Sequence, residues 1–244
     1  MPLLSIVIPA YNEEATIEGL LARVEALPLD KEVLIVDDGS TDGTRAILDR
    51  YVERPGLRVF YQPKNRGKGA AIRRGFIEAR GDIVVVQDAD LEYDPSELPR
   101  LIAPIVDGRA DVVYGARFLP GERRVNQLFH TVGNRGLTLF SNLLSGLDLN
   151  DMETCYKAFR REVIQGLYLE SERFGIEPEM TAKIAKLVRG RRLRLFEMPI
   201  SYEPRWYDEG KKIGWKDGVQ AVWSIMKFNL LTSDEASFRD DLVI

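Results

Sequence analysis

The sequence has one cysteine, Cys155, and one histidine, His130. A single cysteine excludes an intrachain disulfide and favours a reducing compartment. The two residues are also too few for a structural zinc site, which takes nitrogen and sulfur ligands. We therefore expect both side chains to fill space in the interior. Any bound metal is expected to take oxygen ligands, as Mg²⁺ and Mn²⁺ do.

Long hydrophobic runs and an excess of one charge are missing as well. No apolar run approaches the ~20 residues that cross a bilayer. Met1 and Pro2 lead into a β-rich segment rather than a signal peptide. The 34 basic residues nearly balance the 38 acidic ones, and the net charge of −4 argues against a nucleic-acid partner. We expect a cytoplasmic protein; peripheral contact with the cytoplasmic membrane face and homo-oligomerisation are both left open.

Three common nucleotide and hydrolase motifs do not occur. The first β-rich segment is not followed by G-x-G-x-x-G, which argues against a dinucleotide-binding Rossmann domain. Residues 67–69 lack the spacing of a P-loop. The G-x-S-x-G nucleophile elbow is missing too.

The first half of the chain alternates β-rich runs with helical patterns. This alternation, with 45% hydrophobic residues in 244, predicts a single α/β domain whose mainly parallel, twisted sheet has helices on both faces. Right-handed crossovers then place the carboxyl ends of the strands at one edge, where ligands bind. The runs are β-rich at 3–9, 32–38, 57–62, 82–88 and 111–118 and helical at 13–27, 43–53, 67–80 and 96–108.

Beyond residue 120 the alternation ends. We predict helices over 126–146, 177–190 and 217–231, and a strand over 192–202. The 126–146 helix is expected to pack on the core, with lipid docking as the alternative. The last helix is expected either to rest at a membrane interface or to pack in the core or a dimer. Residues 233–244 are expected to form a loose tail.

A cluster of carboxylates follows the β-rich run at 82–88. Positions i, i+2 and i+4 of an extended chain share one side, so Asp88, Asp90 and Glu92 would face one point if the extended geometry continues. Carboxylates held so close raise one another's pKa unless a cation lies between them. A hard divalent metal is the natural cation for such a site.

Polar residues also follow the other four predicted strands. Both acids and bases therefore line one edge of the sheet, which indicates a site for an anionic ligand and a metal. These residues are 9–13 after the first strand, 37–40 after the second, 64–69 after the third and 115–117 after the fifth.

Taken in order, several segments carry a family resemblance. They are IVIPAYNEE (6–14), IVDDGSTDGT (35–44), NRGKGAAIRRGF (65–76), GDIVVVQDADLEYDP (81–95), YGARF (114–118), GNRGLTLFSNLLSG (133–146), DMETCYKAFRREV (151–163), FGIEPEMTAKIAK (174–186) and PISYEPRWYDEGKKIGWKDG (199–218). Together they resemble inverting glycosyltransferases of family 2 with the GT-A fold, and among them the dolichyl-phosphate and polyprenyl-phosphate enzymes. The likeness covers nearly the whole chain.

The resemblance implies a GT-A domain over 1–232, with a nucleotide-sugar-binding half at 1–118 and an acceptor-binding half at 119–232. It also implies transfer of a hexose, mannose from GDP-mannose first and glucose from UDP-glucose next, to a polyprenyl phosphate. The donor would contact Pro9, Ala10, Tyr11, Glu13, Val36, Asp38, Lys68, Gly69 and Asp88. Asp88, Asp90 and Glu92 would hold Mg²⁺ or Mn²⁺, although the family often has Gln in place of Glu92. Arg117 and Arg205 would face phosphates.

The acceptor decides whether a base is needed. A polyprenyl monophosphate, with a second pKa of about 6, attacks without losing a proton and needs cations; the candidates are Arg135, Arg205, Lys211 and Lys212. A hydroxyl acceptor requires a carboxylate base, for which Asp151 and Glu179 are the candidates. With either acceptor, a metal at Asp90 and the guanidinium of Arg117 would stabilise the leaving diphosphate. Two further alternatives are a nucleotidyltransferase and a nucleotide-sugar-binding protein without activity.

Overall fold

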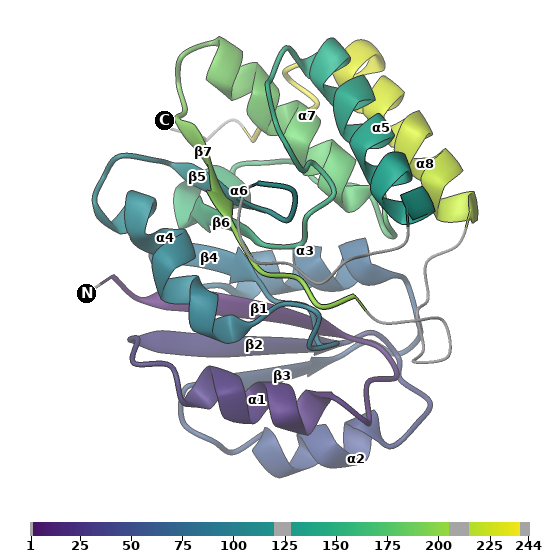
Figure 1. Cartoon of the computed structure of the whole chain (residues 1–244). Helices are drawn as coiled ribbons and strands as arrows, with labels where there is room; N and C mark the ends of the chain where they lie inside the picture. Colours follow the sequence, from purple (N-terminus) through teal and green to yellow (C-terminus); the bar gives the residue numbers. More distant parts are fainter. Residues whose placement is uncertain (1, 120–127, 205–214, 240–244) are drawn as a thin grey trace.

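The computed structural model describes residues 2–119, 128–204 and 215–239. Its centre is a seven-stranded sheet in the order β3-β2-β1-β4-β6-β5-β7 (Figure 1). The sheet is mainly parallel, as predicted. The strands are β1 Leu4–Ala10, β2 Lys31–Asp37, β3 Leu57–Tyr61, β4 Ile83–Val86, β5 Val112–Ala116, β6 Lys157–Arg160 and β7 Leu195–Pro199.

Strand β6 was not predicted, and it runs antiparallel to both neighbours, β4 and β5. It has four residues, too few to show an alternating pattern. Val84 pairs with Phe159 on one side, and Val113 pairs with Ala158 on the other. The strand therefore joins the two halves of the sheet, and it brings residues 151–156 to the edge where β4 and β5 end.

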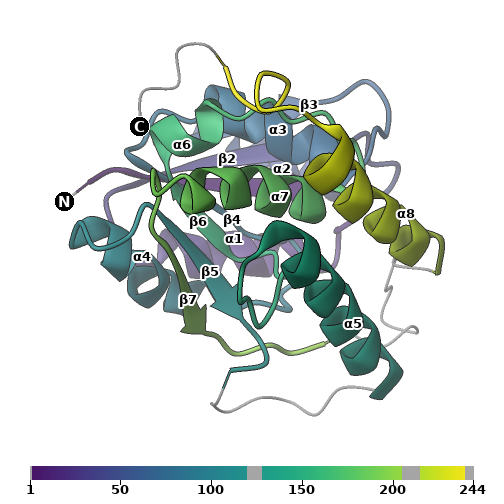
Figure 2. The same ribbon diagram turned by 90° about the horizontal axis from the view of Figure 1, so that it is seen from above.

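Helices cover both faces of the sheet. Helices α1 and α4 lie on one face and α3 and α6 on the other, while α5, α7 and α8 gather at one end (Figure 2). The helices are α1 Ile17–Glu25, α2 Thr44–Leu48, α3 Lys68–Glu78, α4 Leu98–Val106, α5 Leu128–Ser145, α6 Arg161–Gln165, α7 Ile176–Arg189 and α8 Trp215–Met226, with short turns η1 Asp49–Tyr51, η2 Pro95–Glu97 and η4 Lys227–Leu231.

The core lies between the helices and the sheet. Residues of β1 and β4 are almost all buried, because a parallel sheet covered on both faces has no solvent side. Helix α3 packs very closely on β1: a Cβ added to Gly75 would lie 2.2 Å from Cγ1 of Val7. This contact leaves no room for a side chain at Gly75 between α3 and the middle of β1.

The second half departs from the expectations in two places. Residues 233–239 are not a loose tail, because Ser237 is fully buried and Arg239 N donates to Gly166 O at 2.9 Å. Helix α5 packs on the core as expected, but through Leu137, Phe140 and Leu144. The apolar residues whose spacing predicted the buried side are Leu128, Val132, Leu139, Leu143 and Leu147; the first four are all more than half exposed, and only Leu147 packs on the core. Within the described ranges, every helix is too short or too polar to cross a membrane.

Candidate active site

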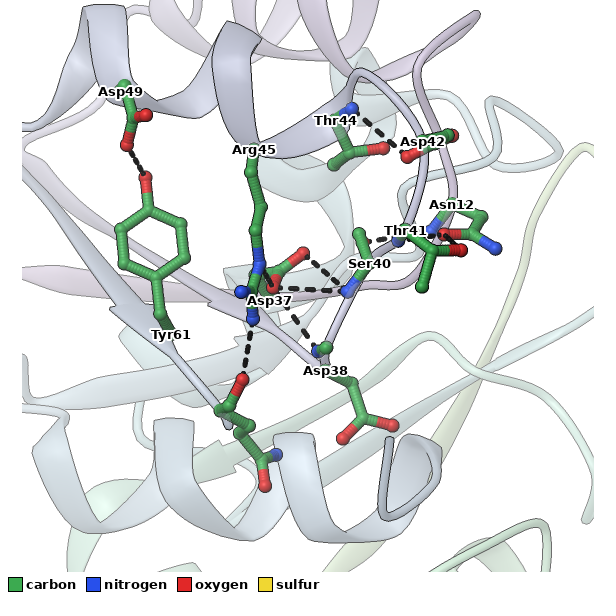
Figure 3. Close-up of polar contacts among 12 residues, drawn as sticks. Asn12, Asp37, Asp38, Ser40, Thr41, Asp42, Thr44, Arg45, Asp49 and Tyr61 are labelled. Atoms are coloured by element: carbon green, nitrogen blue, oxygen red, sulfur yellow. Dashed lines mark hydrogen bonds and ion pairs between the residues drawn. The ribbon is translucent and has the colours of Figure 1, made fainter. Parts of the chain in front are cut away.

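The loops after β1 and β2 are bonded to each other (Figure 3). Asn12, with a φ of 52°, donates from its backbone N to Ser40 Oγ at 3.0 Å, and its Oδ1 accepts from Thr41 N at 2.8 Å. Glu13 N donates to Thr44 Oγ1 at 2.9 Å. The segment predicted to hold the nucleotide is therefore fixed by backbone contacts with the next loop.

Asp37, which the sequence did not single out, anchors the second loop. Its carboxylate is fully buried and accepts from Gly39 N, Ser40 N and Arg45 Nε, the last at 2.7 Å (Figure 3). Arg45 in turn donates to Gln62 O at 2.6 Å. Asp37 therefore has a structural role. In the sequence, only its position next to Asp38 at the end of the second β-rich run pointed to it.

Asp38 holds the third loop. Its two carboxylate oxygens accept from Arg66 N at 2.9 Å and Gly67 N at 2.6 Å, while burial raises its pKa. Ala10 and Val36, both predicted to contact the donor, are buried, at 2% and 0% exposed. The loop that Asp38 holds ends at Lys68, the first residue of α3.

Lys68 connects the third loop to the end of β4. Its Nζ lies 3.0 Å from Asp88 and 3.2 Å from Glu177 at the start of α7. Burial opposes the charged form, but the attraction of Asp88 and Glu177 raises the pKa of Lys68 well above its usual value. The next residue, Gly69, has no room for a side chain, since an added Cβ would lie 2.4 Å from Ser171 O. A permanent positive charge therefore lies beside the first carboxylate of the cluster.

The three carboxylates after β4 do not continue an extended strand. The chain turns at Leu91, which has a φ of 62°, and Asp90 accepts from Glu92 N at 3.1 Å. Glu92 accepts from Tyr202 OH at 2.6 Å. The expected extended geometry is wrong, and the described residues contain no group of three acids, histidines or cysteines that could hold a metal. The assignment of Asp88, Asp90 and Glu92 as metal ligands stays a prediction.

Arg117, at the end of β5, forms a buried ion pair with Asp151. Its Nε and Nη2 donate to the two carboxylate oxygens at 2.7 and 2.8 Å, and its backbone N donates at 3.0 Å. Its guanidinium also lies 5.0 Å from the ring centre of Tyr202. Burial disfavours the charge, but Asp151 raises the pKa of Arg117 further above its already high value. The cation predicted to face a phosphate is thus held rigidly.

Both carboxylates predicted as bases have other partners. Asp151 is fully buried in its pair with Arg117. Glu179, also fully buried, accepts from Glu170 N at 2.9 Å, Ser171 N at 2.8 Å and Lys183 Nζ at 2.6 Å. Each carboxylate thus already accepts hydrogen bonds from a cationic side chain and from at least one backbone N–H group. The geometry argues against both base assignments.

Glu153 was missed in the sequence and lies between these groups. Its charge interacts with Glu177, Lys157, Arg117 and Asp151. Its Oε1 and the Oε2 of Glu177 are buried and accept no hydrogen bond within the described structure. Burial and then the charge of Glu177 raise the pKa of Glu153 to about 8. A carboxyl that keeps its proton near neutral pH therefore lies beside the Arg117–Asp151 pair.

A second cation contacts the same aromatic ring as Arg117. Arg135 of α5 is 5.4 Å from the ring centre of Phe118, and Arg117 is 5.6 Å from the same ring. The structure thus brings together two of the predicted phosphate contacts. Arg205, Lys211 and Lys212 lie outside the described residues.

The single cysteine lies next to the first carboxylate of the cluster after β4. Cys155 is buried, as expected, and its thiol interacts with Asp88.

Comparison of the sequence with those of known proteins relates this chain to sugar transferases. The model of the family described as glycosyl transferase family 2 matches residues 5–167. The undecaprenyl-phosphate mannosyltransferase of Micrococcus luteus is 32% identical, covering 92% of this chain and 93% of that protein. The dolichol-phosphate mannosyltransferase of Pyrococcus furiosus is also 32% identical, over 86% of this chain but 59% of that protein. This chain therefore spans about three fifths of the longer relative.

Among solved structures, glucosyl-3-phosphoglycerate synthase from Mycobacterium tuberculosis, in complex with Mn²⁺ and UDP, matches with a TM-score of 0.72. The match covers 95% of this chain and 81% of that one at 22% identity. At this identity the likeness concerns the fold, and it agrees with the expected GT-A architecture.

Proposed function

Because the chain belongs to glycosyltransferase family 2, it is a glycosyltransferase, and we propose that it moves a hexose from a nucleotide sugar to a polyprenyl phosphate. Two relatives are named for transfer to undecaprenyl phosphate and dolichol phosphate, which supports this class of acceptor. Both are named mannosyltransferases, which favours mannose, and hence GDP-mannose, as the donor. UDP-glucose is the second candidate.

The choice of acceptor rests on one observation: the two carboxylates predicted as bases are buried and already bound to other groups. A hydroxyl acceptor needs a carboxylate within hydrogen-bond reach that can take its proton. Asp151 and Glu179 are fully buried and held by cations and backbone N–H groups. A phosphate monoester is already ionised near neutral pH and needs cations instead. Arg117 and Arg135 both contact the ring of Phe118 and would meet this need.

The carboxylates after β4 fit a hard divalent cation by their chemistry. Asp88 and Asp90 offer oxygen donors, and both are only partly buried at the carboxyl edge of the sheet. These two would hold Mg²⁺ or Mn²⁺, with Glu92 as a third ligand. When bound, such a cation neutralises charge on the departing diphosphate.

The chain's own cations complete the binding of phosphate. Arg117 has five N–H donors and uses two side-chain donors on Asp151, so the others are available to phosphate oxygens. Because Asp151 holds the guanidinium in place, little reorganisation is needed when a substrate binds. Asp151 thus acts as a positioning residue, and Arg135 supplies a second positive charge at the acceptor side.

A matched pair of acceptors tests the proposal. The protein is incubated with Mn²⁺, labelled GDP-mannose or UDP-glucose, and either a short prenyl phosphate or the corresponding prenyl alcohol. We expect the label to pass to the phosphate and not to the alcohol. Transfer to the alcohol, or to neither acceptor with either donor, would refute the proposal. Glu179→Gln should leave turnover with the phosphate acceptor measurable, whereas a hydroxyl-transfer mechanism using Glu179 requires its loss.

A further inference from the structure

Tyr202 contacts both a predicted metal ligand and the arginine predicted to face a phosphate. It follows β7, and its hydroxyl donates to Oε2 of Glu92 at 2.6 Å. The guanidinium carbon of Arg117 lies 5.0 Å from the centre of its ring, within the range of a cation–π contact. One side chain therefore joins the loop after β4 to the end of β5.

The backbone around Tyr202 is fixed against the segment that follows β4. Glu203 N donates to the backbone oxygen of Glu92 at 3.0 Å. Ser201 donates to Oε2 of Glu97 from its backbone N and from its hydroxyl, each at 3.0 Å. Three consecutive residues after β7 therefore contact this segment, and together they fix where the hydroxyl of Tyr202 lies.

The ring of Tyr202 packs on a second tyrosine. The centre of its ring lies 5.3 Å from that of Tyr93, which is almost completely buried. Tyr93 is itself held in place, because its hydroxyl accepts from Cys155 N at 3.2 Å and its ring lies 4.7 Å from that of Tyr156. The ring of Tyr202 thus rests on a buried, bonded neighbour, which limits its rotation away from Arg117.

A carboxylate that holds a metal ion usually accepts a hydrogen bond from a neighbouring group, and this bond sets its orientation. The hydroxyl of Tyr202 makes such a bond to Glu92. From these contacts we propose that Tyr202 is a positioning residue for the nucleoside diphosphate, orienting Glu92 through its hydroxyl and Arg117 through its ring. This role rests on the proposed function, in which a divalent cation at Glu92 and the guanidinium of Arg117 both bind the departing diphosphate.

Two substitutions separate the hydroxyl from the ring. Tyr202→Phe removes only the bond to Glu92, whereas Tyr202→Leu also removes the ring beside Arg117. Calorimetry without any acceptor measures two quantities: the Mn²⁺ affinity at saturating GDP, and the GDP affinity at saturating Mn²⁺, with UDP in parallel. We expect Tyr202→Phe to weaken Mn²⁺ binding about tenfold and to leave the GDP affinity unchanged. Tyr202→Leu should weaken both.

Tyr61→Phe is the matched control. Tyr61 also donates to a carboxylate, that of Asp49 at 2.5 Å, but it lies on β3, the outermost strand beyond β2 and β1. Its substitution should change neither affinity. In a Glu92→Ala background, Tyr202→Phe should change the Mn²⁺ affinity less than twofold, because the group that the hydroxyl orients is gone. Circular dichroism verifies that each variant is folded, and Tyr202→Phe alone decides if Tyr202→Leu is not.

Three results would count against these assignments. A Mn²⁺ affinity that is unchanged in Tyr202→Phe, or that changes equally in the Glu92→Ala background, would overturn the positioning role of the hydroxyl. A folded Tyr202→Leu variant that binds GDP as the wild type does would overturn that of the ring. Both results leave the proposed function intact. A wild-type protein that binds neither GDP nor UDP with Mn²⁺ would refute the proposed donor site itself, and the positioning role with it.

Discussion

Arg117 and Asp151 join the end of β5 to the loop before β6 through two side-chain hydrogen bonds of 2.7 and 2.8 Å, with the Asp151 side chain fully buried and that of Arg117 9% exposed. Asp151 was predicted as a catalytic base. Its pairing with Arg117 favours a different role, in which Asp151 holds an arginine proposed to bind phosphate. Glu197 of β7 supports the same loop, because its carboxylate accepts from Asn150 N at 2.9 Å and Asp151 N at 3.2 Å.

Removing the carboxylate of this pair should destabilise the protein. We expect Asp151→Ala to lower the free energy of unfolding by roughly 3–5 kcal/mol, because it leaves Arg117 buried without its counter-charge. Asp107→Ala is the control, since its pair with Arg109 is more than half exposed and should contribute little. Urea denaturation measures both. Equal unfolding midpoints for the two variants would contradict the importance of the buried pair.

The metal assignment predicts a loss of activity at Asp90. We expect Asp90→Ala to reduce transfer at least about a hundredfold, because the dication is asked to supply several kcal/mol of leaving-group stabilisation. Initial rates in saturating Mn²⁺ are the measurement, with Asp107→Ala again as control because Asp107 ends α4 and precedes β5. Full activity of Asp90→Ala under these conditions would refute the assignment. A lost thermal shift with GDP-mannose and Mn²⁺ would support it.

Glu153 predicts an unusual dependence of stability on pH. The carboxyl has a pKa of about 8 in the folded protein against 4.5 as the reference value, so unfolding releases its proton between these pH values. Its contribution to stability is therefore present in acid and falls as the pH rises through this window. Glu153→Gln should flatten that decline, as measured by unfolding midpoints from pH 5 to pH 8. Parallel curves for wild type and variant would contradict the raised pKa.

Two glycines in helices should respond oppositely to alanine. A Cβ at Gly69 would meet Ser171 O at 2.4 Å and Arg173 O at 2.9 Å, so Gly69→Ala must displace backbone beside Lys68. We expect a loss of about 1–3 kcal/mol in stability, with weaker donor binding. A Cβ at Gly136 meets nothing within 4 Å, so Gly136→Ala should stabilise the helix by about 0.5–1 kcal/mol. Thermal melting distinguishes them, and a stable Gly69→Ala would contradict the close packing.

The local sequence determined much of this protein by itself. Runs such as 82–88, rich in β-branched residues and bounded by polar loops, specify buried strands, and their alternation with helical patterns specifies a mainly parallel sheet. That arrangement alone places Asp38, Lys68, Asp88 and Arg117 at one edge. The family resemblance rests on the same segments, because they are continuous along the chain.

Only the tertiary structure decided what those residues contact. Arg117 is 34 residues from Asp151, so no local pattern shows that the two form a pair. The partners of Glu179 are only four to nine residues away, but the backbone N–H groups of residues 170 and 171 reach it because of how the loop before α7 folds. Strand β6 was too short to show a period, yet it positions Glu153 and Asp151. The stripe of α5 has the same spacing whether it faces a core or a lipid, because periodicity reports that a helix has two faces, and packing decides which one is covered.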